Sequence, residues 1–246
     1  MSRTAQRATL TLLLVIGVGC SSATSHVEIL ASIRADAPGP AWNAESLDYR
    51  VLERLAFSYG HHVVITPISD ASSTERPLLD ASIPGLSLTG LNPRQLDDLA
   101  VADRKLSESA LHALWSRAAG RQRTEIIAAT VAAAERFADD PPGTRKILIV
   151  LSTGFEQSSV VNMADVSQNL NAETWPVIRR LGKSQMLPQL SGVTVCMASI
   201  SAGLHGWSDS PEYRRIHRFW HAYFQTAGAA LISYGPALPD RCINGT

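Results

Sequence analysis

The chain carries five consecutive apolar residues between Lys146 and Ser152, and this run is followed by Thr153 and Gly154. A short apolar run without alternation is typical of a strand buried on both faces, as in a parallel sheet covered by helices. We therefore take it as the central strand. Ligands of such sheets bind at the carboxyl ends of the strands, so Ser152 and Thr153 are expected at a binding site.

The rest of the chain alternates between two hydrophobic patterns. Helical spacing of apolar residues, with caps and prolines at the boundaries, predicts helices at 43–60, 93–102, 107–119, 124–138, 177–185 and 210–228. Compact apolar stretches predict strands at 25–33, 61–68, 192–200 and 229–234, with a short edge piece at 77–81. This alternation predicts an α/β fold, a doubly wound and mostly parallel sheet with helices on both faces.

The first twenty residues have a pattern of their own. Arg3 and Arg7 precede an apolar run at 8–19, which is followed by Cys20. A basic start and a short apolar run predict a secretory signal peptide, which leaves 21–246 as one domain. The end of this segment, 17–20, resembles the lipobox of bacterial lipoproteins, although Gly17 stands where leucine is usual. The alternative is an ordinary signal peptide cleaved nearby.

The lipobox resemblance implies that Cys20 is the lipid attachment site and the mature N-terminus. We therefore expect an exported chain that is lipid-anchored in the cell envelope, on the periplasmic face or at the outer membrane. Ser21 after the cysteine favours the outer membrane by the same resemblance.

The amino-acid composition of the chain limits the kinds of partner that we expect it to bind. With 45% hydrophobic residues the chain can bury one substantial core. Lys and Arg together number 22, as do Asp and Glu, so no net charge draws the chain to nucleic acid. The membrane contact is expected through the lipid anchor alone.

Two cysteines remain after Cys20, namely Cys196 and Cys242. An exported chain permits a disulfide between them. A buried free thiol at Cys196, inside an apolar strand, is the alternative. No Cys/His spacing in the sequence indicates a structural zinc site.

Three segments together resemble the von Willebrand factor A (VWA) family. They are the central strand 146–155, the segment from Arg123 and Thr124 into an alanine-rich helix, and the aromatic helix that runs from Phe219 to Gly228. The last of these is similar to VWA-like proteins of bacterial plasmids and mobile elements. The resemblance covers nearly the whole mature chain and implies a VWA-like, Rossmann-type three-layer fold that binds a protein partner.

The family's metal site uses an Asp-x-Ser-x-Ser turn after the first strand, a threonine, and an aspartate after the central strand. Here the first turn runs from Ser32 to Asp36 without the leading aspartate, and Thr153 stands where the second aspartate belongs. Thr124 is retained. We expect a degenerate, metal-free site without a cofactor, whose candidate binding rim is Ser32, Asp36, Thr124, Ser152 and Thr153.

A second segment has the form of the missing turn. Asp70, Ser72 and Thr74 follow the second predicted strand in the pattern Asp-x-Ser-x-Thr. They could form a metal-dependent adhesion site for Mg²⁺, Mn²⁺ or Ca²⁺, because hard oxygen ligands suit these ions. The alternative for this segment is a capped polar turn.

Signs of catalysis are absent from the sequence patterns. There is no Gly-x-Ser-x-Gly elbow and no phosphate-binding glycine loop. His217 and His221 lie at metal-ligand spacing, but Arg218 follows where a metalloprotease needs glutamate, and a polar helix flank is favoured. We expect a protein-binding module and no enzyme, with an envelope enzyme of unrecognised site as the alternative. The partner would contact loops 34–42, 69–74, 152–159 and 201–209.

Overall fold

A computed structural model of the chain describes residues 25–32, 61–82, 92–95, 97–98, 101–102, 105, 109, 124–163, 170–198, 210–235 and 238–244. Cys20, Asp36 and the loops 34–42 and 201–209 lie outside these residues. So do the predicted helix at 43–60 and, except for residue 109, the predicted helix at 107–119. Of the helix predicted at 93–102, residues 93–95, 97–98 and 101–102 are described, and they are helical.

The core of the molecule is one six-stranded sheet, with strand order β3-β2-β1-β4-β5-β6. Every neighbouring pair is parallel except β2 and β3, so β3 is an antiparallel edge strand. This confirms the predicted mostly parallel α/β sheet, with the 146–151 run as an inner strand. The strands are β1 (Ser25–Ser32), β2 (His61–Ile68), β3 (Leu79–Ser82), β4 (Arg145–Leu151), β5 (Val193–Ala198) and β6 (Ala230–Gly235).

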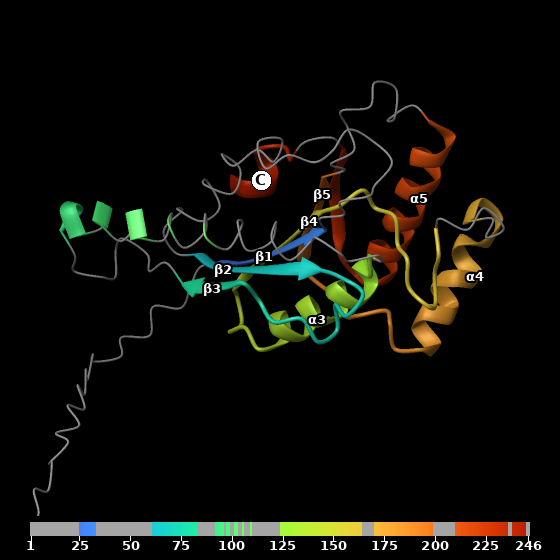
Figure 1. The fold of residues 1–246 in the computed structure, drawn as a ribbon, viewed down its shortest axis with the longest axis horizontal. Helices are drawn as coiled ribbons and strands as arrows, with labels where there is room; N and C mark the ends of the chain where they lie inside the picture. Colours follow the sequence, from blue (N-terminus) through green and yellow to red (C-terminus); the bar gives the residue numbers. More distant parts are fainter. Residues whose placement is uncertain are drawn as a thin grey trace, which may run out of the picture.

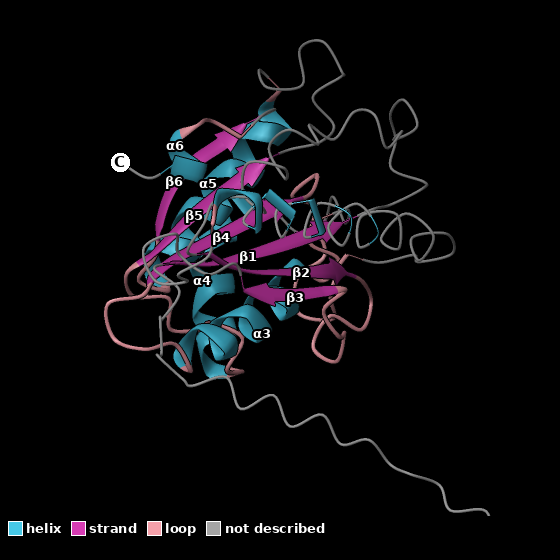
Figure 2. Cartoon of the chain, turned by 90° about the vertical axis from the view of Figure 1, so that its left-hand side faces the viewer, coloured by secondary structure: helices cyan, strands magenta, loops and turns pink. Residues whose placement is uncertain are grey.

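Three long helices are described: α3 (Ile126–Ala138), α4 (Leu170–Lys183) and α5 (Pro211–Thr226). Their apolar side chains join alternate residues of β1, β4 and β5 in one buried cluster, so they cover the same face of the sheet. Figure 2 shows α3 and α4 on one side of the sheet and α6 (Arg241–Asn244) on the other. No described helix has both the length and the apolar character needed to cross a membrane.

The second face of the sheet is equally buried. It is formed by the other alternate residues, among them Val27, Ile29, Ile147 and Ile149, with Leu238 packed against them. Helix α6 lies on this side and is held by the disulfide between Cys196 of β5 and Cys242. Helices therefore lie on both faces, as expected for a doubly wound sheet.

Helix α4 differs from its prediction. It begins at Leu170, seven residues before the predicted start at Val177, and Pro176 lies inside it. A proline inside a helix removes one backbone hydrogen bond. Burial of Val177, Ile178 and Leu181 against the sheet stabilises the helix in spite of that loss.

Candidate functional site

Side chains from three segments meet at the carboxyl ends of β1 and β4. Ser32 ends β1, Ser152 follows the neighbouring strand β4, and Thr124 precedes α3. The Ser32 Oγ and Thr124 Oγ1 atoms are 3.5 Å apart, and these three side chains are buried. We call Ser32, Thr124, Ser152 and the half-buried Thr153 the carboxyl-end rim; Figure 1 labels the strands β1 and β4, at whose carboxyl ends it lies.

The turn after β4 is closed by the rim's own hydroxyls. The Ser152 Oγ accepts a hydrogen bond from the Gly154 N–H at 3.2 Å, and the Thr153 Oγ1 accepts one from the Phe155 N–H at 3.4 Å. Gly154 has a φ of +80°, which favours glycine, and the Trp220 Nε1–H donates to its carbonyl at 2.8 Å. The conformation of this turn is thus stabilised by its own hydroxyl groups and by Trp220 of α5.

Glu156 is a residue that the sequence patterns did not single out. Its carboxyl group is buried, and its Oε2 accepts a hydrogen bond from the Ile127 N–H at 3.0 Å, at the start of α3. Glu125, the residue at the cap position of α3, makes no side-chain cap bond, so Glu156 takes this role from a distant loop. Burial raises the pKa of Glu156 to about 8, even though backbone hydrogen bonds lower it, so this carboxyl group is protonated at neutral pH.

The rim does not fit the divalent cation that the family resemblance implies. Mg²⁺, Mn²⁺ and Ca²⁺ need several oxygen ligands, normally with ionised carboxylates among them. The described rim offers hydroxyls, while the neighbouring Glu156 is neutral and engaged with a helix N–H. The described rim is a set of hydroxyl groups, of which that of the half-buried Thr153 is the most accessible.

The segment with Asp70, Ser72 and Thr74 is a self-contained turn. The Ser72 Oγ accepts from the Ser69 N–H at 2.8 Å and donates to the Ser69 carbonyl at 2.8 Å. The Thr74 Oγ1 donates to the Ala71 carbonyl at 3.1 Å. Both hydroxyls are thus hydrogen-bonded to the backbone within the turn. This geometry favours the capped polar turn.

The histidine pair of α5 is part of an aromatic stack. The rings of His217 and His221 are 6.4 Å apart, and His217 stacks on Tyr234 at 5.0 Å. Burial, with the charge of His221, lowers the pKa of His217. Within the part of the chain that the structure describes, no third histidine, cysteine or carboxylate joins them in a ligand cluster. The pair packs the flank of the helix.

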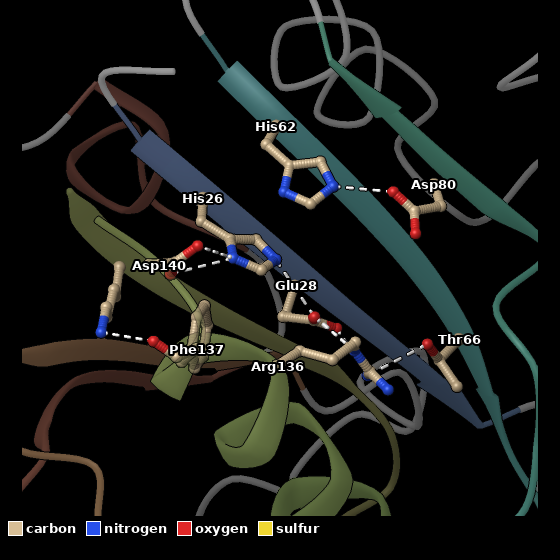
Figure 3. A network of polar contacts seen from close by, with 9 residues as sticks. His26, Glu28, His62, Thr66, Asp80, Arg136, Phe137 and Asp140 are labelled. Carbon is tan, nitrogen blue, oxygen red and sulfur yellow. Dashed lines mark hydrogen bonds and ion pairs between the residues drawn. The ribbon is translucent and has the colours of Figure 1, made fainter. Parts of the chain in front are cut away.

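A second polar cluster lies near the opposite, amino-terminal ends of the strands (Figure 3). Glu28, in the middle of β1, has no exposed surface and receives two hydrogen bonds from the Arg136 guanidinium of α3, at 2.6 and 2.8 Å. The Arg136 Nη2 also donates to the Thr66 hydroxyl at 3.3 Å. Such a two-point ion pair is among the stronger polar contacts in proteins.

His26 continues this cluster towards the strand start. Its Nδ1 lies 2.9 and 3.0 Å from the two carboxylate oxygens of Asp140, and its Nε2 lies 3.2 Å from Glu28. Burial lowers the pKa of His26, but Glu28 and Asp140 together raise it above its ordinary value. We call His26, Glu28, Arg136 and Asp140, with the neighbouring pair His62 and Asp80, the amino-end network.

The amino-end network was missed from sequence, although two signals pointed to it. Glu28 is a charged residue between the apolar Val27 and Ile29 of a strand, and Arg136 is a charged residue on an alanine-rich helix. A buried charge requires a partner. The sequence did not reveal that these two residues pair with each other, because Glu28 and Arg136 are 108 positions apart.

No family model matches the sequence, and no curated protein matches it. Solved structures that it resembles include the SpRpn10 VWA domain, at 11% identity over 90% of this chain and 95% of that chain, with a TM-score of 0.45. A second is BatB from Bacteroides thetaiotaomicron, at 14% identity over 71% of this chain and 65% of that chain, with a TM-score of 0.39. A third is manganese-loaded Plasmodium vivax TRAP, at 12% identity over 83% of this chain and 63% of that chain, with a TM-score of 0.39.

The chain thus spans just under two thirds of the BatB and TRAP chains. At these TM-scores the likeness carries no argument about ligand or partner. The solved structures and the resemblance from sequence agree on the VWA-like fold alone. The order and directions of the strands in the sheet establish the mostly parallel α/β class by themselves.

Proposed function

We propose that this chain is an exported, lipid-anchored, VWA-like module that binds a protein partner in the cell envelope and catalyses no reaction. The contact surface is the carboxyl end of the sheet, where Thr153 is the half-buried member of the rim, together with the exposed residues in the first half of α4. No divalent cation takes part at this surface, because the rim's hydroxyls and the neutral Glu156 do not form a hard-cation site.

The observation that carries this proposal is the exposure of Trp175. Among the described residues, Trp175 and Val101 are the large apolar side chains that are exposed, and Trp175 is 57% exposed. Because β4 and β5 are parallel, α4 runs back from the carboxyl ends to the amino ends of the strands, and Trp175 lies in its first half. Tryptophan is enriched among the residues that dominate binding energy in protein interfaces. An exposed tryptophan towards the carboxyl end of the sheet suits a protein partner.

Site-specific photo-cross-linking in the cells that naturally make the protein tests this surface. We expect a discrete adduct when the cross-linking residue replaces Thr153 or Trp175. The control position is Gln189, which is exposed but lies before β5, at the other end of the sheet. Equal adducts from Gln189, or none from the rim, would contradict the proposal. Adducts lost on adding chelator would instead favour the metal-dependent site at Asp70, Ser72 and Thr74.

Export and anchoring need a separate test. The disulfide between Cys196 and Cys242 supports export, because such bonds persist in oxidising compartments. We expect Cys20→Ser to move the chain out of the membrane fraction, since acyl chains on Cys20 would be its anchor. A Ser21→Ala variant, which keeps the cysteine, is the matched control. Membrane retention of the Cys20→Ser chain would contradict the anchor.

A further inference from the structure

Three side chains of the amino-end network bring potential metal ligands together. His26, His62 and Asp140 each offer one ligand atom, and these atoms lie within 4.8 Å of one another. His26 and His62 are paired in register on the parallel strands β1 and β2, so their rings lie side by side on the face that α3 covers. Asp140 reaches them from the turn between α3 and β4. This grouping lies at the opposite end of the strands from the carboxyl-end rim.

The two imidazoles are oriented by carboxylates. The His62 Nε2 lies 2.7 Å from the Asp80 Oδ1, and the His26 Nε2 lies 3.2 Å from the Glu28 Oε1. The Nδ1 of His26 lies against the Asp140 carboxylate, and Figure 3 shows the other ring nitrogen of His62 on the side that faces His26. A carboxylate that holds the far nitrogen of a histidine is the usual outer partner of a metal-binding imidazole.

We propose that His26, His62 and Asp140 bind one divalent transition-metal ion of the zinc class. The ligands are the Nδ1 atoms of both histidines and one carboxylate oxygen of Asp140, while Glu28 and Asp80 act as outer partners. Two imidazoles and one carboxylate are a common zinc ligand set, with solvent in the fourth position. Imidazole ligands also select against Mg²⁺ and Ca²⁺, which prefer oxygen.

The distances are close to those that a metal would impose. Two ligand atoms about 2.1 Å from a tetrahedral ion lie about 3.4 Å from each other. His26 Nδ1 and the Asp140 oxygens, at 2.9 and 3.0 Å, need to separate only slightly. His62 would make the remaining adjustment, and its side chain is 28% exposed, whereas His26 is 2% exposed. The ion would therefore enter from the His62 side.

Nearby positive charges are engaged elsewhere. The Arg136 guanidinium is bound to Glu28, and the Lys146 Nζ donates to the Phe137 carbonyl at 2.5 Å. Asp140 and Asp80 contribute negative charge on the two sides of the histidines. A histidine nitrogen binds a metal only without its proton, so binding through the His26 Nδ1 releases any proton held there.

The test is metal titration of the full chain, stripped with chelator and then exchanged into chelator-free buffer. We expect one Zn²⁺ per chain by calorimetry, and visible absorption bands of low-coordinate Co²⁺ when cobalt is used as the probe. Asp80→Ala should weaken binding by about 10–100-fold, the usual effect of losing an outer partner. His62→Ala and Asp140→Asn, which each remove a ligand, should weaken binding further than Asp80→Ala does.

His61 and His221 lie outside the cluster and serve as controls. His61 is the neighbour of His62 in β2, so its side chain points to the opposite face, and His61→Ala should leave Zn²⁺ affinity unchanged. Asp140→Asn keeps the size of the side chain, which separates loss of a ligand from loss of folding. Absence of Zn²⁺ binding would overturn the proposal, as would binding unaffected by His62→Ala and Asp140→Asn, loss of binding in His221→Ala alone, or equal affinity for Mg²⁺.

Discussion

The two ends of the β1–β4 strand pair treat buried polar groups in opposite ways. At the carboxyl end, hydroxyl groups close a turn, and the buried Glu156 is neutral because burial raises its pKa to about 8. At the amino end, Glu28 is just as buried but is paired with a guanidinium at 2.6 Å. Two equally buried carboxyl groups therefore differ in the partner that α3 supplies: a guanidinium for Glu28 and a backbone N–H for Glu156.

This contrast separates two kinds of surface. A neutral hydrogen-bonding rim suits a protein partner, whereas oriented imidazoles and carboxylates suit a metal ion. The variants below alter one end at a time, so that each end can be assigned its own contribution.

The largest effect is expected from breaking the ion pair at the amino end. Arg136→Met leaves Glu28 buried without its guanidinium, and removing one partner of a buried pair costs about 3–5 kcal/mol. Urea unfolding should show a loss of stability of this size. Arg180→Met, on an exposed position of α4, should change stability by less than about 0.5 kcal/mol.

A double variant sharpens this result. Glu28→Met with Arg136→Met removes both charges, and apolar replacement of a buried pair is often neutral. We expect it to be more stable than Arg136→Met alone. A double variant as unstable as the single one would mean that the charges are not coupled and that the cost is one of packing.

The next effect is a pH dependence at the carboxyl end. The pKa of Glu156 is raised from 4.5 to about 8, so between these values the folded chain holds a proton that the unfolded chain releases. Its contribution to stability is complete below pH 4.5 and is lost as pH rises to about 8, at about 1.4 kcal/mol per pH unit.

Glu156→Gln keeps the shape of the side chain and removes the titration. Unfolding midpoints measured between about pH 5 and about pH 8 should therefore fall less steeply in this variant than in the natural chain. The raised pKa of His26 acts with the same sign above its ordinary value of 6.5, whereas the lowered pKa values of His61 and His217 act with the opposite sign, so the comparison rests on the difference between the two profiles. Parallel pH profiles in both chains would contradict a neutral Glu156.

A smaller effect is expected at Gly154, beneath the rim. A Cβ atom there would lie 2.6 Å from the Tyr234 hydroxyl, and the φ of +80° is unfavourable for alanine. The left-handed conformation alone costs about 1–2 kcal/mol. Gly143→Ala, at φ +86° with nothing near its Cβ, measures that backbone cost, so Gly154→Ala should be the more destabilising. Equal losses would show that the turn has room for a methyl group.

The contrast also explains what could be predicted from sequence. Helix α5 was predicted because its signals are local: the Ser210 Oγ accepts from the Tyr213 N–H at 3.0 Å, and Pro211 begins the helix. The strands followed from their apolar runs for the same reason. In contrast, His26 and Asp140 are 114 positions apart, and Glu156 caps a helix 29 positions earlier. Periodicity assigns a side chain to a face, but it does not select the partner.

The smallest effect on stability is expected at Asp80, and it gives the sharpest separation of structure from binding. The contact between His62 and Asp80 is 2.7 Å, but Asp80 is 62% exposed, and exposed pairs contribute about 0.2–1 kcal/mol. Asp80→Ala should therefore unfold almost like the natural chain, although its Zn²⁺ affinity falls by about 10–100-fold. Ser82→Ala, in the same edge strand, keeps Asp80 and should change neither quantity. If Asp80→Ala lowered stability as much as Arg136→Met does, Asp80 would belong to the folding core of the amino end and its part in metal binding would be indirect.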